Sequence, residues 1–318
     1  MVLLFPGQGS QAPKMGAFLF ENFPTFRNTI SEASEAISHD LQNLIFDGMD
    51  AELALTANTQ PALLATQIAT LRTVNELCDL KTAAAAGHSV GEYAALVAAG
   101  VLDFTVAMKA VRLRGQAMQN AVSLGAGGMV AVLGLDPEQV NWLCEWTLKE
   151  SGHSPLSPAN FNCPGQIVIS GSMKCIDWLK LNFKAEQIPG SPKRAKLIPL
   201  NVSAPFHCAM MKPAQDKMES FLDSIVFKAP RFPIIQNFTA TVVENPIDLK
   251  NNLIQQISAP VLWTQTMKAL ETRNWHTGIE CGHGSVLKGL FKKMENPRFK
   301  ILGSQSQGDL DILKAQQF

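Results

Sequence analysis

The pentapeptide Gly87-His88-Ser89-Val90-Gly91 has the G-x-S-x-G pattern of a serine nucleophile. It follows the short apolar stretch 82–86, which predicts a buried strand, and precedes 92–99, which favours a helix with Gly100 as its C-cap. A serine at such a strand-to-helix turn projects from the sheet, close to the free N–H groups that begin the helix. The bare pattern also occurs by chance in glycine-containing turns, but this context predicts a catalytic Ser89.

A serine nucleophile requires a general base, and His207 is the best candidate among the six histidines. Pro205 and Phe206, which precede it, indicate a rigid and partly apolar loop. A buried imidazole in such a loop keeps a low pKa and accepts a proton readily. A packed structural histidine is the alternative interpretation. His283, framed by two glycines, is a rival base, although its surroundings favour a turn ahead of a helix beginning at Val286.

Two further segments carry polar groups suited to acyl chemistry. The turn Gly7-Gln8-Gly9 ends a predicted strand at 2–5 and would place oxyanion-hole donors beside the nucleophile, unless it is a plain strand-to-loop turn. Arg114 lies on a predicted helix among apolar residues, where arginine is uncommon without a partner. Its guanidinium suits a carboxylate. The alternative is an ordinary surface arginine, as we expect for Arg112.

Composition excludes several classes of protein. The 318 residues are 46% hydrophobic and 17% charged, which indicates a sizeable core and argues against disorder. Lysine plus arginine equals aspartate plus glutamate, 27 each, so the net charge favours neither nucleic acid nor membrane as a partner. The cysteines form no C-x-x-C pair and no metal-like cluster, which predicts reduced thiols in a cytoplasmic protein. We expect a first strand rather than a signal peptide at the N-terminus, and no apolar run is long enough to span a bilayer.

Alternating strand-like and helix-like stretches predict an α/β fold with a mostly parallel sheet. After the glycine run at 125–128 the predicted order becomes strand, helix, strand, strand, helix, strand. This order predicts a ferredoxin-like small subdomain at 125–198, inserted into a large subdomain formed by 1–124 and 199–318. Within the large subdomain we expect a buried helix at 60–71 that begins at its proline.

Together these segments resemble the malonyl-CoA:acyl carrier protein transacylases of type II fatty acid synthesis, which are related to the acyltransferase domains of polyketide synthases. The resemblance extends over nearly the whole chain. It departs from the family at 281–290, where His283 replaces the usual proline and Ser285 the usual lysine. The motifs that carry it, in the family's order, are FPGQGSQ at 5–11, TQPALL at 59–64, GHSVGEYAALVAAG at 87–100, RLRGQAMQ at 112–119, NFNCPGQIVISG at 160–171, VSAPFHCAMM at 202–211 and PVLW at 260–263.

The resemblance implies an α/β-hydrolase-like core with a ferredoxin-like insert, and it implies a role for the residues around the nucleophile. Ser89 would be the nucleophile and His207 its base. The oxyanion hole would consist of Gln8 and the backbone N–H of Val90. In this family a main-chain carbonyl takes the place of the acid of a catalytic triad. That carbonyl would belong to Gln256, although the adjacent glutamine leaves the register open.

The resemblance also implies how the substrate is selected. Arg114 would bind the free carboxylate of a malonyl group. Phe206 matches malonyl-selective relatives, and its ring would crowd an α-methyl branch, so methylmalonyl should be a poor substrate.

The implied reaction moves a malonyl group from malonyl-CoA to the phosphopantetheine thiol of acyl carrier protein, through a malonyl-serine intermediate and without cofactor or metal. It would supply fatty acid biosynthesis in the cytoplasm, and we expect a monomer with no nucleic-acid or membrane partner. The alternatives are a free-standing polyketide synthase acyltransferase and an acyl-carrier-protein acyl hydrolase, which is expected to lack the arginine at position 114. A lipase-type esterase would need the order Ser, Asp, His, and a non-enzymatic scaffold would have lost Ser89 or His207.

Acyl carrier proteins are acidic, so a basic rim is expected near the mouth of the active site. Two clusters are candidates, although ordinary solvated side chains explain each equally well. They are Lys193, Arg194 and Lys196, and Lys288, Lys292 and Lys293.

Overall fold

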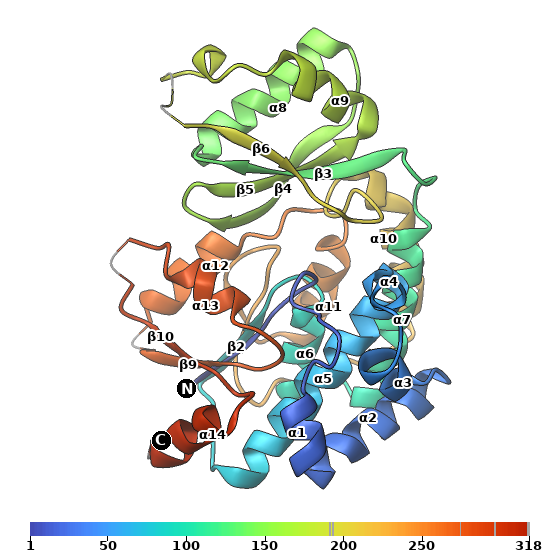
Figure 1. Cartoon of the computed structure of the whole chain (residues 1–318), viewed down its shortest axis with the longest axis vertical. Coiled ribbons are helices and arrows are strands. Elements are labelled where there is room, and N and C mark those ends of the chain that lie inside the picture. The colour runs from blue at the N-terminus through green and yellow to red at the C-terminus, as the bar shows by residue number, and fades with distance from the viewer. Residues whose placement is uncertain (191, 193, 274, 296, 317–318) are drawn as a thin grey trace.

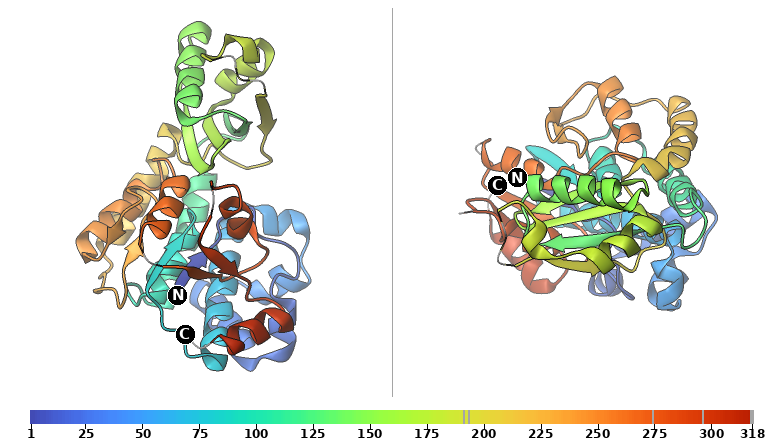
Figure 2. Two further views of the ribbon diagram at one scale, coloured as in Figure 1. Left: turned by 90° about the vertical axis from the view of Figure 1, so that its left-hand side faces the viewer. Right: turned by 90° about the horizontal axis from the view of Figure 1, so that it is seen from above.

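Two β-sheets, each covered by its own helices, organise the chain (Figure 1). The structure is a computed structural model that describes residues 1–316 apart from 191, 193, 274 and 296. Within these residues, a larger part holds a six-stranded sheet and a smaller part a four-stranded sheet. Figure 2 shows the smaller part seated on one end of the larger one, which carries both ends of the chain.

The large sheet has the strand order β10-β9-β1-β2-β7-β8. All its pairings are parallel except the last, between β7 and β8, so the predicted mostly parallel sheet is confirmed. The strand that leads to Ser89 lies near the middle of the sheet. The strands are β1 (Val2–Phe5), β2 (Ala84–Gly87), β7 (Ile234–Ile235), β8 (Val242–Val243), β9 (Thr277–Glu280) and β10 (Lys300–Leu302).

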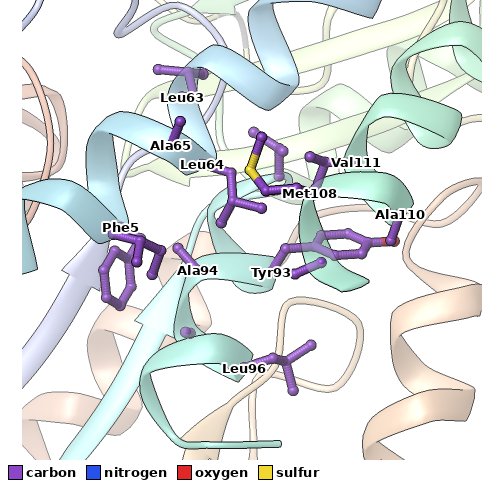
Figure 3. Close-up of a cluster of buried hydrophobic side chains, with 14 of the residues drawn as sticks. Phe5, Leu63, Leu64, Ala65, Tyr93, Ala94, Leu96, Met108, Ala110 and Val111 are labelled. Atoms are coloured by element: carbon purple, nitrogen blue, oxygen red, sulfur yellow. The ribbon is translucent and has the colours of Figure 1, made fainter. Parts of the chain in front are cut away.

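Helices cover both faces of this sheet. Figure 3 shows how three of them pack: Leu64 of α5, Tyr93 of α6 and Met108 of α7 meet in one buried cluster. No helix among the described residues is long and apolar enough to cross a membrane. The helices are α1 (Ala17–Asn22), α2 (Pro24–Ile37), α3 (Leu41–Phe46), α4 (Asp50–Ala54), α5 (Thr56–Leu77), α6 (Gly91–Ala98), α7 (Phe104–Gln119), α10 (Lys212–Asp223), α11 (Pro246–Gln255), α12 (Trp263–Glu271), α13 (Val286–Phe291) and α14 (Gln307–Ala315).

The helix predicted to begin at Pro61 begins five residues earlier, at Thr56, so that prediction is wrong. Proline has no N–H to donate, and its place inside α5 leaves the carbonyl of Ala57 without its helical partner. Arg112 supplies one, because its Nη1 donates to that carbonyl oxygen over 2.6 Å and to Oδ1 of Asn58 over 2.7 Å. Arg112, expected on the surface, is therefore half-buried between α5 and α7.

The small sheet has the order β4-β5-β3-β6, and all its pairings are antiparallel. Its strand, helix, strand, strand, helix, strand sequence is the predicted one. Successive side chains of a strand point to opposite faces. On β3, Val130 and Val132 therefore pack under the small part's own helices, while Met129 and Ala131 join the core of the larger part. The elements are β3 (Gly127–Leu133), α8 (Pro137–Ser151), β4 (Leu156–Cys163), β5 (Gln166–Ser172), α9 (Met173–Asn182), a short 3₁₀ helix (Ala185–Gln187) and β6 (Lys196–Pro199).

Candidate active site

Ser89 occupies a tight turn between β2 and α6, with its backbone in the left-handed region at φ 52°. Two glycines make this turn possible. A Cβ atom on Gly87 would lie 2.0 Å from the carbonyl oxygen of Gly91, and a Cβ on Gly91 would lie 2.2 Å from the carbonyl oxygen of Phe5. The turn therefore holds a non-glycine residue in a sparsely populated conformation, as strained functional residues often are.

The imidazole of His207 connects the serine to a main-chain carbonyl. Its Nε2 lies 2.8 Å from Oγ of Ser89, and its Nδ1 lies 2.8 Å from the carbonyl oxygen of Gln256. A carbonyl oxygen only accepts hydrogen bonds, so Nδ1 carries the hydrogen of the neutral ring. Nε2 is then the acceptor for the serine hydroxyl, which is the tautomer that a general base requires.

The surroundings keep His207 neutral. The side chain is buried, with 3% of its surface exposed. Burial and, second, the positive charge of Arg114 lower the pKa of His207 to about 3. An imidazole with this pKa is unprotonated throughout the physiological range and is able to accept the serine proton.

Arg114 is a buried cation that neutral amides hold in place. It projects from α7, with 1% of its surface exposed. Its Nη1 donates to Oε1 of Gln60 over 2.9 Å, and its Nη2 donates to Oε1 of Gln256 over 2.9 Å and to Oγ of Ser89 over 3.2 Å. No carboxylate of the described residues forms an ion pair with it. Burial lowers the pKa of Arg114, and Glu92 is near enough for its carboxyl group to raise that pKa by a smaller amount, but it makes no direct ion pair. A buried charge without a carboxylate in contact is costly, so this guanidinium is able to bind an anion beside the serine.

A cavity of about 140 Å³ opens in front of these groups, between the two parts of the molecule. The large part contributes Ser89, His207 and Arg114 to its lining, and the small part contributes Met129 and Asn160. The cavity therefore brings the predicted nucleophile, base and cation together. Its remaining lining residues are Gln8, Gln60, His88, Val90, Met118, Asn162, Val168, Leu200, Val202 and Phe206.

Gln8 and Val90 line the same cavity, Gln8 from the beginning of the loop after β1 and Val90 from the N-cap of α6. The main-chain N–H groups of both residues make no hydrogen bond to any described residue. The side chain of Gln8 is turned to Oγ1 of Thr56, 3.2 Å from its Nε2. Two unpaired N–H groups beside a serine hydroxyl are able to stabilise negative charge on an oxygen.

His283 lies outside the residues that line this cavity. It stands between Gly282 and Gly284, both with positive φ, in the turn that leads into α13. Burial lowers the pKa of His283, and the neighbouring side chain of Gln305 partly offsets that effect. The structure therefore offers no contact between this histidine and the serine.

Three amide side chains of the site were not identified from the sequence. Gln60 and the side chain of Gln256 clamp Arg114, and Nε2 of Gln256 also donates to the carbonyl oxygen of Ser89 over 3.1 Å. Asn237 accepts from the N–H of Ser89 over 2.6 Å. One available signal was the position of Gln60 directly before the apolar run 61–65. Within the described ranges, no cluster of three or more metal-ligating side chains is present.

Known proteins that are similar to this chain in sequence and structure are acyltransferases. The acyl transferase domain family matches residues 2–314. The malonyl CoA-acyl carrier protein transacylase of Bacillus subtilis (strain 168) is 42% identical over 98% of this chain and 95% of its own. A solved acyl carrier protein S-malonyltransferase from Vibrio cholerae is 40% identical, with a TM-score of 0.90 and coverage of 98% of this chain and 99% of its own. A malonyl-transacylase solved in complex with a type II polyketide synthase acyl-carrier protein is 38% identical, with a TM-score of 0.91 and 98% of both chains covered. This chain therefore belongs to the acyl transferase family, among its malonyl CoA-acyl carrier protein transacylases.

Proposed function

We propose that this protein transfers a malonyl group from malonyl-CoA to the phosphopantetheine thiol of acyl carrier protein. One observation carries the proposal: the buried cation of Arg114 lies 3.2 Å from the hydroxyl of Ser89 and has no carboxylate partner among the described residues. A malonyl thioester presents a carboxylate close to its reactive carbonyl. One malonyl group would therefore pair with the cation of Arg114 and place its carbonyl carbon beside the hydroxyl of Ser89. The names of the relatives point to the same substrate pair.

In the first half of the reaction, Nε2 of His207 takes the proton of Ser89, and Oγ attacks the thioester carbonyl. The N–H groups of Gln8 and Val90 stabilise the oxyanion that forms. The carbon–sulfur bond then breaks, and the protonated His207 returns its proton to the departing coenzyme A thiolate. The product is a malonyl ester on Ser89, and the main-chain carbonyl of Gln256 orients the histidine throughout.

In the second half, His207 accepts the proton of the phosphopantetheine thiol, and the sulfur attacks the malonyl ester. Collapse of the second oxyanion breaks the ester bond, and Ser89 regains its proton from His207. One thioester replaces another, so the exchange needs neither an energy source nor a cofactor. Arg114 holds the malonyl carboxylate through both halves.

The first alternative is a hydrolase that releases the acyl group to water. Arg114 argues against it, because the hydrolases of this fold are expected to lack that arginine. The partition of products tests the proposal. With malonyl-CoA and holo acyl carrier protein, we expect malonyl-carrier protein as the main product, whereas free malonate as the main product would assign the protein to the hydrolases.

The second alternative is an acyltransferase of polyketide synthesis. The relatives include a transacylase solved with a polyketide carrier protein, at an identity similar to that of the others. We propose that the carrier is that of fatty acid synthesis, as the motif resemblance implies. Rates with purified carrier proteins of each kind would decide between them.

We infer that the large part, 1–124 and 199–318, is an α/β-hydrolase-like subdomain, and that 125–198 is a ferredoxin-like insert. The position of Ser89 after a central parallel strand supports the first inference. The β4-β5-β3-β6 order with antiparallel pairing supports the second.

We also propose that the carrier protein docks beside β6. Lys196 begins this edge strand, and Leu200, just after its end, lines the cavity. Arg194 lies two residues before the strand, while Lys193 lies outside the described residues. Lys288 and Lys292, of the other basic cluster, line a separate hollow between α13 and β10.

The low pKa of His207 predicts that the enzyme keeps its activity to an unusually low pH. Its neutral form is the active one, and its pKa of about 3 extends that form to low pH. We expect kcat/KM for malonyl-CoA to change less than about twofold between about pH 8 and about pH 5, where an exposed histidine would lose about 30-fold. Stability must be monitored in parallel, because an unfolded His207 binds a proton below about pH 6.5 and so weakens folding in acid. A fall of about 30-fold in a protein that remains folded would contradict the low pKa.

Phe206 lines the cavity next to the base, with 7% of its surface exposed. We expect its ring to exclude an α-methyl branch. In Phe206→Ala, the ratio of kcat/KM for methylmalonyl-CoA to that for malonyl-CoA should rise roughly 10-fold or more, the range for one added carbon in a tight pocket. An unchanged ratio would show that Phe206 does not set this selectivity.

A further inference from the structure

Asn237 lies just beyond β7, at the level where the neighbouring strand β2 ends. The parallel pairing places Ile235 opposite Ala86, so Asn237 follows two residues later, beside the nucleophile turn. Its Oδ1 accepts from the N–H of Ser89 over 2.6 Å, and its Nδ2 donates to the carbonyl oxygen of Gly87 over 2.6 Å. Both ends of one side-chain amide are therefore bound to the turn.

Through these two bonds, the side chain of Asn237 extends the hydrogen-bond pattern between β2 and β7 past the last paired residues of the two strands. In a parallel ladder, one residue bonds through its N–H and C=O to the two residues that flank its partner. The side-chain amide of Asn237 makes these two bonds to Gly87 and Ser89, the residues on either side of His88. At this point the main chain no longer pairs with β7. On the opposite side, the N–H of His88 donates to the carbonyl oxygen of Phe5 in β1 over 2.9 Å. The turn is thus fixed from both neighbouring strands.

Asn237 is itself held rigidly, because its main chain is bound on both sides and the residue is fully buried. Its N–H donates to Oε2 of Glu92 in α6 over 2.7 Å, and its carbonyl oxygen accepts from the N–H of Leu262 over 3.0 Å. Glu92 also accepts from Nε2 of Gln236 over 3.1 Å. A side chain fixed in this way is able to impose a conformation on its neighbour.

We propose that Asn237 is a positioning residue that holds Ser89 in its left-handed conformation and thereby aims Oγ at His207. The bond fixes the orientation of the N–H of Ser89, and this group lies at one end of the N–Cα bond about which φ is 52°. The proposal rests on the proposed function for its acyl-transfer readout. The positioning role can be tested separately, since it concerns the reactivity of Ser89 toward any electrophile that reacts with a serine hydroxyl.

The test compares Asn237→Ala and Asn237→Asp with the unaltered protein. Two rates are measured: labelling of Ser89 by a fluorophosphonate and formation of malonyl-Ser89 after rapid mixing with malonyl-CoA. Affinity for malonyl-CoA is measured separately in a Ser89→Ala background. Gln215→Ala, which removes another buried amide, from α10, is the matched control.

In Asn237→Ala we expect both rates to fall about 100-fold per folded molecule, the scale of a misplaced reacting group, while malonyl-CoA affinity changes less than about twofold. Gln215→Ala should keep both rates. Rates within about threefold of the unaltered protein in Asn237→Ala, or an equal loss of affinity and rate, would overturn the proposal. If the unaltered protein reacts with the fluorophosphonate but not with malonyl-CoA, the proposed function fails and the labelling rates still decide the role of Asn237.

Asn237→Asp keeps the shape of the side chain and the acceptor for the N–H of Ser89. A protonated aspartic acid also regains a donor for the carbonyl of Gly87, so this variant should react faster than Asn237→Ala, most clearly toward low pH. Each rate is divided by that of the unaltered protein at the same pH, because Glu92, His207 and Arg114 surround the turn in both proteins. An aspartate variant no faster than the alanine variant at any pH would contradict the proposed pair of hydrogen bonds.

Discussion

His207→Ala is expected to slow the formation of malonyl-Ser89 by roughly 10²- to 10⁴-fold, the contribution of a positioned general base. The serine hydroxyl loses its acceptor at 2.8 Å, and no other imidazole lies in contact with it among the described residues. Affinity for malonyl-CoA should change less than about twofold, because we propose that Arg114, and not the histidine, binds the carboxylate. Single-turnover kinetics followed by intact-protein mass spectrometry would measure the rate.

His153→Ala is the matched control, since this histidine is exposed in the loop before β4. It should acylate Ser89 at the unaltered rate. If His207→Ala retained the rate of His153→Ala, another group would have to act as the base and the assignment of His207 would be wrong.

Arg114→Ala is expected to reverse the preference for a malonyl group. Truncating one partner of a buried charged pair costs about 2–5 kcal/mol, so kcat/KM for malonyl-CoA should fall roughly 30- to 5,000-fold. Acetyl-CoA should gain relative to malonyl-CoA, because an acetyl group leaves the buried cation unpaired in the unaltered protein and no cation remains in the variant. The two values of kcat/KM, measured with the same carrier protein, give the ratio.

Arg112→Ala separates charge selection from the loss of an arginine on α7. Arg112 donates a hydrogen bond to the carbonyl oxygen of Ala57, which Pro61 leaves without a helical partner, and it does not line the cavity. We expect a less stable protein with an unchanged ratio of malonyl-CoA to acetyl-CoA. An unchanged ratio in Arg114→Ala as well would remove Arg114 from its proposed role.

Local patterns were sufficient to predict the elements that carry the site. The strand before Gly87 and the helix after it occur where the apolar run and the alanine-rich segment predicted them. The order of strands and helices from β3 to β6 was predictable because turns separate its two strand-helix units clearly. The start of α5 was not, because the carbonyl group that Pro61 leaves without a helical partner is bound by Arg112, which is distant in the sequence. No local signal in the sequence indicates such compensation.

The candidate nucleophile, base and cation of the site were also predictable, since a serine, a histidine and an arginine stand out by type within apolar segments. The amides that position them were not. Gln60, Asn237 and the side chain of Gln256 come from three separate elements and meet only in the folded protein. Their role depends on which atom faces which neighbour, and residue spacing along the chain carries no such information.

The mass of the intact protein after mixing with malonyl-CoA tests the central claim most directly. We predict the gain of one malonyl group, its absence in Ser89→Ala, and its complete transfer to holo acyl carrier protein added afterwards. An adduct that forms with other acyl thioesters but not with malonyl-CoA, or that persists in Ser89→Ala, would contradict malonyl transfer through Ser89.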